Sequence, residues 1–209
     1  MPAATRLYLA RHGSTVVSHE DRFAGSSDVE LSERGREEAE RLGRRLADRR
    51  FAAIYTSPMR RSVDTATRVA APHDLDPRPS PELVEVDHGR WEGLTRREVE
   101  SKFPQEHADW ERDPFNTAPR GGTTGAVVVT RVVPFIQRIA REHAGREILA
   151  VSHKATLRLL TAILLGIDPR RYRDFLDQRP CALSLFELRD ASSARLLLFN
   201  DVSHHAPDH

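Results

Sequence analysis

The sequence has little of several features that would each point to a particular class of protein. It contains a single cysteine, Cys181, which excludes a disulfide framework and a cysteine-based metal site. It has no apolar run near the roughly 20 residues that cross a membrane as a helix, and its first residues lack the hydrophobic stretch of a signal peptide. The 32 Lys and Arg residues balance 31 Asp and Glu residues without forming a basic block, which argues against nucleic acid as a partner. We therefore expect a soluble, cytoplasmic protein with neither nucleic-acid nor membrane partners.

Internal repeats, low-complexity tracts and obvious linkers are also missing from the 209 residues. A net charge of only +1 argues against disorder, which needs a large net charge as well as low hydrophobicity. The chain is long enough to bury a core. We expect one domain over residues 1–209, present as a monomer or a homodimer.

What the sequence does contain is an alternation of apolar strand-like segments with helical segments. The expected strands cover residues 6–10, 52–56, 148–152, 182–188 and 194–200. The expected helices cover 32–48, 59–70, a segment opened by a capping box at Thr95 and Glu98, a segment bent at Pro134, and 155–165. A proline-rich loop over 76–81 and an irregular surface insertion over 103–122 complete the pattern. It predicts an α/β fold, a three-layer α/β/α sandwich with a mostly parallel central sheet.

Polar residues that can bind phosphate follow the ends of three expected strands. Arg11 and His12 follow the first strand, Thr56-Ser57 follows the second, and His153 follows the third directly before a helix. Because parallel strands end at one edge of a sheet, we expect the two histidines to lie close together. A helix N-terminus and arginine side chains both suit an anion. The sequence thus predicts an anion site at this edge, with Arg22 and Arg61 as further candidates.

The motifs around these residues occur in the order of a known family. Leu9-Ala10-Arg11-His12-Gly13 resembles the Arg-His-Gly motif of the histidine phosphatase superfamily, which includes the phosphoglycerate mutases. Further segments are similar to the family's motifs: residues 21–25, 28–35, 55–62 with Thr65 and Ala66, 85–93, and 151–153. The matches span nearly the whole chain, so the chain is identified as a member of this family, with its phosphoglycerate mutase-like fold.

The resemblance implies roles for the matching residues. His12 would be the nucleophile that takes the phosphoryl group as a phosphohistidine, with the backbone near Gly13 setting its tautomer. Arg11, Arg61 and His153 would hold the phosphoryl oxygens, with Arg22 as a further ligand, and Glu85 would transfer the proton. Arg61 is preferred to Arg60 because it has the Ser-Pro-x-x-Arg spacing. No cofactor is expected, because arginines supply the charge and no carboxylate cluster offers ligands to Mg²⁺.

The sequence departs from the family pattern at the rim of the expected pocket. Ser14 and Ser18 stand where many members have Glu and Asn, and Thr123-Thr124 replaces a Glu-Ser pair. Lys154-Ala155 stands in place of Gly-Gly. These departures leave the phosphoryl-transfer residues intact and put only the substrate in question.

The expected activity is hydrolysis of small-molecule phosphate monoesters through a phosphohistidine. The alternative is a cofactor-dependent phosphoglycerate mutase, which shares the first half-reaction but must shield its phosphoenzyme from water. A more remote alternative is a sensor that binds a phosphate ligand without catalysis. The short chain favours the phosphatase, and retention of His12, Glu85 and His153 disfavours the sensor.

The substrate stays open among phosphoserine, α-ribazole 5′-phosphate, phosphosugars and phosphoglycerates. Asp87-His88-Gly89 is similar to a segment of the family's phosphoserine phosphatases, which makes His88 a substrate-binding candidate. Lys154 is placed to reach a substrate carboxylate, or is a solvated helix residue. Residues 200–204 resemble the family's closing segment, which can lie near the pocket, whereas His205 and His209 are expected to be tail residues.

Overall fold

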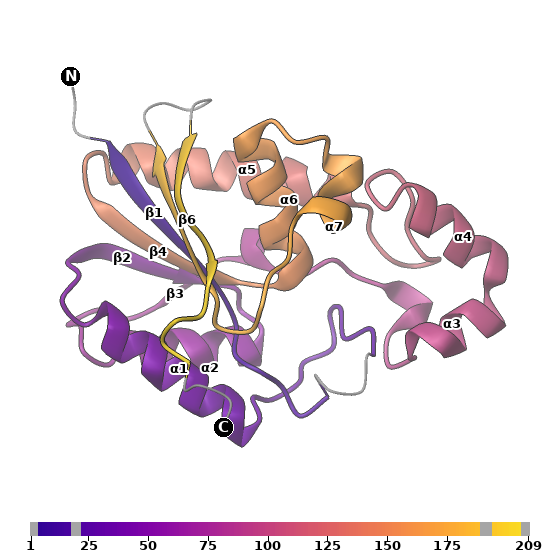
Figure 1. Ribbon diagram of the computed structural model, residues 1–209, viewed down its shortest axis with the longest axis horizontal. Helices are drawn as coiled ribbons and strands as arrows, with labels where there is room; N and C mark the ends of the chain where they lie inside the picture. Colours follow the sequence, from indigo (N-terminus) through magenta and orange to yellow (C-terminus); the bar gives the residue numbers. More distant parts are fainter. Residues whose placement is uncertain (1–3, 18–21, 189–193, 206–209) are drawn as a thin grey trace.

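A six-stranded mixed sheet forms the centre of the computed structural model, which describes residues 4–17, 22–188 and 194–205 (Figure 1). Its strands are β1 (Thr5–Arg11), β2 (Phe51–Thr56), β3 (Arg78–Pro79), β4 (Glu147–Ser152), β5 (Leu183–Leu188) and β6 (Ala194–Asp201). They lie in the order β3-β2-β4-β1-β5-β6. The pairs from β3 to β1 are parallel, and β5 and β6 are antiparallel. The sheet is therefore mostly parallel, as the sequence predicts.

Helices cover both faces of this sheet. They are α1 (Glu33–Leu46), α2 (Arg60–Ala70), α3 (Arg96–Lys102), α4 (Pro104–Arg112), α5 (Gly125–Glu142), α6 (Lys154–Leu165) and α7 (Tyr172–Phe175). Single 3₁₀ turns occur at Pro81–Leu83, Gly89–Trp91 and Pro169–Arg171. Figure 1 shows α1 and α2 on one side of the sheet, α5 and α6 on the other, and α3 with α4 together at one end of the molecule.

Alternating strand residues build two separate cores. Leu7 and Leu9 of β1 face one way and pack with the apolar side of α5 and α6, whereas Tyr8 and Ala10 face the other way and pack with α1 and α2. This period of two is what a strand buried on both faces requires. The two cores confirm the three-layer α/β/α sandwich.

Local signals in the sequence set several helix starts. Ser32 caps α1 by accepting a hydrogen bond from the Gly35 N–H, and the capping box of Thr95 and Glu98 opens α3 as expected. The helix α5 continues through Pro134 from Gly125 to Glu142. No helix in the described ranges combines the length and apolar character needed to span a bilayer.

Two segments differ from the sequence-based expectation. Residues 103–122 were expected to be irregular, but they contain α4, because Pro104 occupies the first helical position, where a missing N–H costs nothing. The helix is held by Trp110, which is buried in a small cluster with Trp91 and Val99. The expected loop over 76–81 contains the short edge strand β3 beside β2. Pro79 is tolerated there because an edge strand can lack a hydrogen-bond donor.

Candidate active site

His12 is held at the end of β1 by the backbone of its neighbours. Its N–H donates to the Ser152 carbonyl at 3.0 Å, and its carbonyl accepts from the Cys181 N–H at 3.3 Å. The bond to Ser152 extends the pairing of β1 with β4 beyond Arg11, and the bond from Cys181 comes from the segment before β5 on the other side of β1. The side chain is 6% exposed and lines a pocket at the carboxyl ends of the parallel strands. This is the edge at which open α/β sheets bind their ligands.

The His12 ring has a defined tautomer. Its Nδ1 lies 2.8 Å from the Gly13 carbonyl oxygen, which can only accept, so Nδ1 carries the proton and Nε2 keeps a lone pair. Burial lowers the pKa of His12 well below its usual value, and the charges of Arg11 and Arg61 lower it further. The ring is therefore neutral at neutral pH, as a nucleophilic imidazole must be.

The loop that follows His12 is clamped onto α1. A Cβ on Gly13 would lie 2.4 Å from the Gly35 carbonyl oxygen, so only glycine permits this approach. Beyond Gly13, the buried carboxylate of Glu38 accepts from the Ser14 N–H at 2.8 Å and from the Ser14 hydroxyl at 3.0 Å. The Ser14 N–H and the Gly13 carbonyl belong to one peptide group, so the Glu38 carboxylate fixes the same peptide that sets the His12 tautomer.

Two arginines bring positive charge to His12. Arg11 anchors one end of its guanidinium on the Gln178 carbonyl at 2.8 Å, while its buried Nε has no hydrogen-bond partner among the residues that the structure describes. Arg61, in the first turn of α2, is 2% exposed and lines the same pocket. It donates to the carbonyls of Gly25 and Ser27 at 2.8 and 2.7 Å. Arg60, by contrast, lies on the surface in an ion pair with Glu30.

His153 lies beside His12 but is turned away from the pocket. The two ring centres are 5.1 Å apart, and the His153 side chain is fully buried. Its Nδ1 accepts from Arg61 Nε at 3.2 Å, and its Nε2 lies 2.8 Å from the Ser57 hydroxyl. Burial, followed by the influence of His12, lowers its pKa well below the usual value. In this arrangement His153 positions Arg61 rather than facing a ligand.

Glu85 sits at the N-terminus of α6, a helix whose own N-cap residue, His153, makes no side-chain cap. Its Oε2 accepts from the Ala155 N–H at 3.0 Å, and its Oε1 accepts from the N–H and hydroxyl of Thr156 at 3.0 and 3.1 Å. The Val86 N–H donates to the same Oε1 at 2.9 Å. The carboxylate thus caps the N-terminus of α6, and these hydrogen bonds fix its position in the lining of the pocket.

The pocket encloses about 260 Å³, which suits a small molecule. It brings together most of the residues expected from the sequence: Arg11, His12, Arg22, Arg61, Glu85, His88 and Lys154. Arg22 donates to the Gly93 carbonyl at 2.7 Å and pairs with Glu98. His88 packs against the Phe23 ring, and burial lowers the pKa of its imidazole.

Other expected residues lie elsewhere. The closing segment, residues 200–204, does not line the pocket; His204 instead lies 3.0 Å from Arg45 of α1. His205 lines the same shallow hollow beside α1 as His204. Ser18 and His209 fall outside the described residues. Within the described ranges, no three His, Cys, Asp or Glu side chains gather as ligands for a metal ion.

Comparison with known families assigns the chain that carries this site. Residues 7–202 match the family model described as "Histidine phosphatase superfamily (branch 1)". The chain belongs to this family. The match covers every residue of the pocket edge described above, which confirms the resemblance seen in the motifs.

Relatives and solved structures agree with this assignment. The chain is 31% identical to phosphoserine phosphatase 1 of Hydrogenobacter thermophilus, over 81% of each protein. It is 33% identical to the glucosyl-3-phosphoglycerate phosphatase of Mycolicibacterium vanbaalenii, over 78% of this chain and 75% of that protein. Among solved structures, YhfR of Bacillus stearothermophilus superimposes with a TM-score of 0.90 at 32% identity, covering 96% of this chain and 99% of that one.

Several lining residues of this histidine phosphatase were missed in the sequence. They are Arg96 of α3, Trp110 of α4, Arg158 of α6, and Tyr172 and Arg173 of α7. Only Arg158 could be recognised in the sequence, because it is the single charged residue among residues 155–165. The others come from surface-like segments whose approach to the strand ends depends on tertiary packing.

Proposed function

We propose that this protein is a phosphomonoesterase that works through a phosphohistidine on His12. The observation that carries the proposal is the neutral His12 ring, whose Nε2 lone pair is free of the Gly13 hydrogen bond, in a pocket that Arg11 and Arg61 also line. A nucleophile needs that lone pair, and the transferring phosphoryl group needs fixed positive charge. Both requirements meet in one pocket of a size suited to a small ester.

The reaction runs in two half-reactions. Nε2 of His12 bonds to phosphorus while the bond from phosphorus to the ester oxygen breaks, and the leaving alcohol takes up a proton. Water then attacks the phosphohistidine, which releases inorganic phosphate and restores the imidazole. Arg11 and Arg61 stabilise the equatorial oxygens in both steps. Hydrolysis rather than mutase activity is proposed because the site as described requires only water as the second acceptor.

Glu85 is the proposed proton carrier of both steps. It is the only carboxylate among the described lining residues of the pocket, and its oxygens are fixed by four hydrogen bonds. A positioned group of this kind delivers the proton to the leaving oxygen and later takes one from water. The further role predicted for His153, a direct contact with phosphoryl oxygens, requires its ring to rotate away from Ser57 and stays a prediction.

Trapping the intermediate tests the proposal. Enzyme mixed with radiolabelled alkyl phosphate and quenched under alkaline conditions should carry label on His12 that is stable to base and lost in acid. His12→Ala should carry none and should lose turnover. His73→Gln, which alters a histidine packed on Phe51 outside the pocket, should label like the native protein. Undiminished turnover in His12→Ala would refute the mechanism.

A further inference from the structure

A second set of cations lines the pocket beyond those assigned to the phosphoryl group. Lys154 and Arg158 come from the first two turns of α6, and Arg173 comes from α7. Lys154 is exposed, and partial desolvation, followed by the charges of Arg11 and Arg158, lowers the pKa of its ammonium group. Because Arg11, Lys154 and Arg158 line the same pocket, its cations reach from the phosphoryl end to the α6–α7 side.

The two arginines of this set are held rigidly. Arg158 donates through Nη2 to the Arg173 carbonyl at 2.6 Å and lies over the Tyr172 ring. Arg173 donates to Glu111 at 2.6 Å and stacks 3.9 Å from the centre of the Trp110 ring. Stacking and backbone contacts of this kind fix a guanidinium before a ligand arrives, which lowers the entropy lost on binding.

The same arginines have donors left over. Arg158 Nε and Arg173 Nη1 are buried and have no hydrogen-bond partner in the part of the chain that the structure describes. Burial lowers the pKa of Arg158, whereas the charges of Tyr172, the exposed Asp177 and Glu85 raise it. In the described ranges, no carboxylate lies within 4 Å of a nitrogen of Arg158 or Lys154. Buried cationic donors without partners are costly, so a site that retains them fits a ligand that supplies the missing anion.

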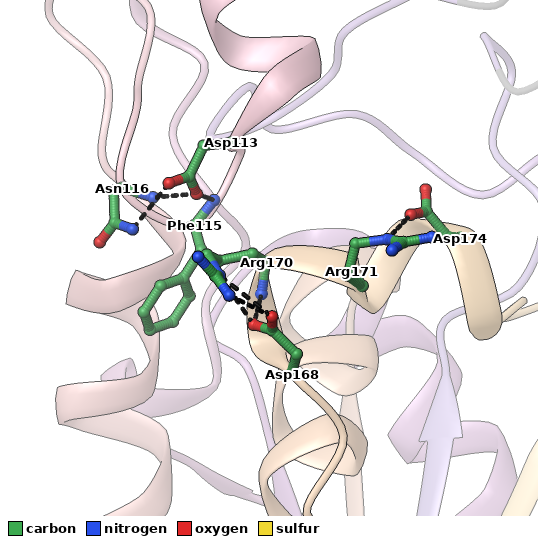
Figure 2. Close-up of polar contacts among 7 residues, drawn as sticks. All are labelled: Asp113, Phe115, Asn116, Asp168, Arg170, Arg171 and Asp174. Carbon is green, nitrogen blue, oxygen red and sulfur yellow. Dashed lines mark hydrogen bonds and ion pairs between the residues drawn. The ribbon is translucent and has the colours of Figure 1, made fainter.

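Neighbouring arginines outside the pocket show the contrast. Figure 2 shows Arg170 bound to Asp168 by several hydrogen bonds and Arg171 paired with Asp174. These surface arginines, from the turn before α7, are neutralised by carboxylates only two or three residues away. The pocket arginine Arg158 has no such partner within the described part of the chain, although it contacts Arg173 of α7.

We propose that the substrate carries a second anionic group, a carboxylate or a second phosphate, that binds to Arg158 and Lys154 with Arg173 beside them. The proposal rests on the phosphomonoesterase function and narrows its substrate class. The scissile phosphate dianion is matched by Arg11 and Arg61, so the remaining pocket cations are in excess for an ester with a neutral organic part. An ester with anions at both ends satisfies both sets.

Matched pairs of synthetic substrates test this inference. One series consists of alkyl phosphates that end in a carboxylate, with two to six carbons, each compared with its uncharged carboxamide. A second series compares alkanediol bisphosphates with the corresponding monophosphates. For the series that matches the site, kcat/KM should favour the charged ester about 10- to 100-fold at the best length, the usual effect of a hydrogen bond to a charged group. The series with the larger preference identifies the anion as carboxylate or phosphate.

Variants assign the preference to Arg158. Arg158→Met should reduce the ratio of kcat/KM for charged over uncharged ester at least tenfold, and Arg158→Lys should restore part of it. The matched control is Arg170→Met, which removes an arginine that already has Asp168 as its partner and should keep the full ratio. Because the ratio is taken within one variant, partial unfolding of a variant cancels out.

The outcomes separate this inference from the function on which it rests. Equal kcat/KM for charged and uncharged esters at every length would overturn the second-anion site while leaving a phosphatase. Equal losses for both esters in Arg158→Met would make Arg158 structural and overturn its assignment. Failure to release phosphate from any ester, p-nitrophenyl phosphate included, would instead overturn the proposed function.

Discussion

Replacement of Glu85 by glutamine changes both the reaction and the start of α6. The carboxylate accepts hydrogen bonds on both oxygens, from Val86 and Thr156 on Oε1 and from Ala155 on Oε2. A carboxamide has one oxygen and one NH₂ group, so in either orientation at least one backbone N–H would face another donor. Glu85→Gln is therefore not a silent isosteric change in this fold.

The expected loss of stability and the expected loss of rate differ enough in size to be told apart. A hydrogen bond to a charged group contributes about 1.5–3 kcal/mol, so the free energy of unfolding should fall by about that amount. Domains of this kind have about 5–15 kcal/mol of stability, so the variant stays folded. Loss of general acid catalysis should slow phosphoryl transfer from an alkyl phosphate about 10²- to 10⁴-fold. The destabilisation is too small to produce that loss by unfolding the enzyme.

The assay compares two leaving groups in the same variant. In a reaction through a phosphoenzyme, kcat/KM reports the steps up to release of the alcohol, so it isolates the half-reaction in which the acid acts. An alkoxide needs a proton, whereas p-nitrophenolate is a weak base that leaves without one. Glu85→Gln should thus lose far more kcat/KM on the alkyl ester than on p-nitrophenyl phosphate. Urea unfolding measures the stability change separately.

Glu82→Gln provides the control, because Glu82 lies three residues away and its carboxylate makes a partly exposed ion pair with Arg138. It should change stability by less than about 0.5 kcal/mol and leave both rates as they are. Equal losses on the two esters in Glu85→Gln would show that Glu85 is not the acid, and His88 would be the next residue to test. Unchanged stability would contradict the hydrogen bonding at the start of α6.

Further predictions follow from the same residues. Glu38→Leu leaves the Ser14 N–H without its acceptor and should lower the free energy of unfolding by about 1–3 kcal/mol, with Glu38→Gln milder and the surface variant Glu37→Leu nearly neutral in urea unfolding. Because the pKa values of His12 and His153 are lowered in the fold, the unfolded chain binds more protons below pH about 6.5. The free energy of unfolding should therefore be about 2–3 kcal/mol lower at pH 5.5 than at pH 7.5. This difference should be smaller in the double variant with His12→Gln and His153→Gln. Incubation with 3-phosphoglycerate and 2,3-bisphosphoglycerate should release phosphate with little isomerisation. Isomerisation at roughly tens of turnovers per second would favour the mutase instead.

Much of the fold could be read from the sequence because the signals that set it are local. Alternation of apolar residues fixes which face of β1 each side chain takes, and the cap at Ser32 and the box at Thr95 fix where helices begin. The strand ends then follow from topology, which is why His12 and His153 could be expected side by side. The same reasoning failed at α4, whose helix depends on burial of Trp110 rather than on a regular apolar pattern.

The candidate site was predictable only at its phosphoryl end. Arg11 and His12 belong to a contiguous motif, whereas Glu38 reaches Ser14 from 24 positions away and looks like any polar residue of an amphipathic helix. Arg173 becomes a pocket residue only because Trp110 and Glu111 of another helix orient it. Sequence patterns do not encode such contacts, because each depends on where two distant segments meet.

The division of the pocket between two kinds of segment has a consequence for how such an enzyme diverges. His12, Arg11 and Arg61 belong to the strand ends and to α2, where the sheet fixes each position. Arg96 and Trp110 belong to α3 and α4, which lie together at one end of the molecule, and Arg173 belongs to α7 beside α6 (Figure 1). Mutations in the second group can change the accepted ester without touching the first. Natural selection can therefore change the substrate through residues 96–112 and 169–175 while the residues of the catalytic step stay the same. A mutant library confined to these two ranges would vary the substrate in the same way.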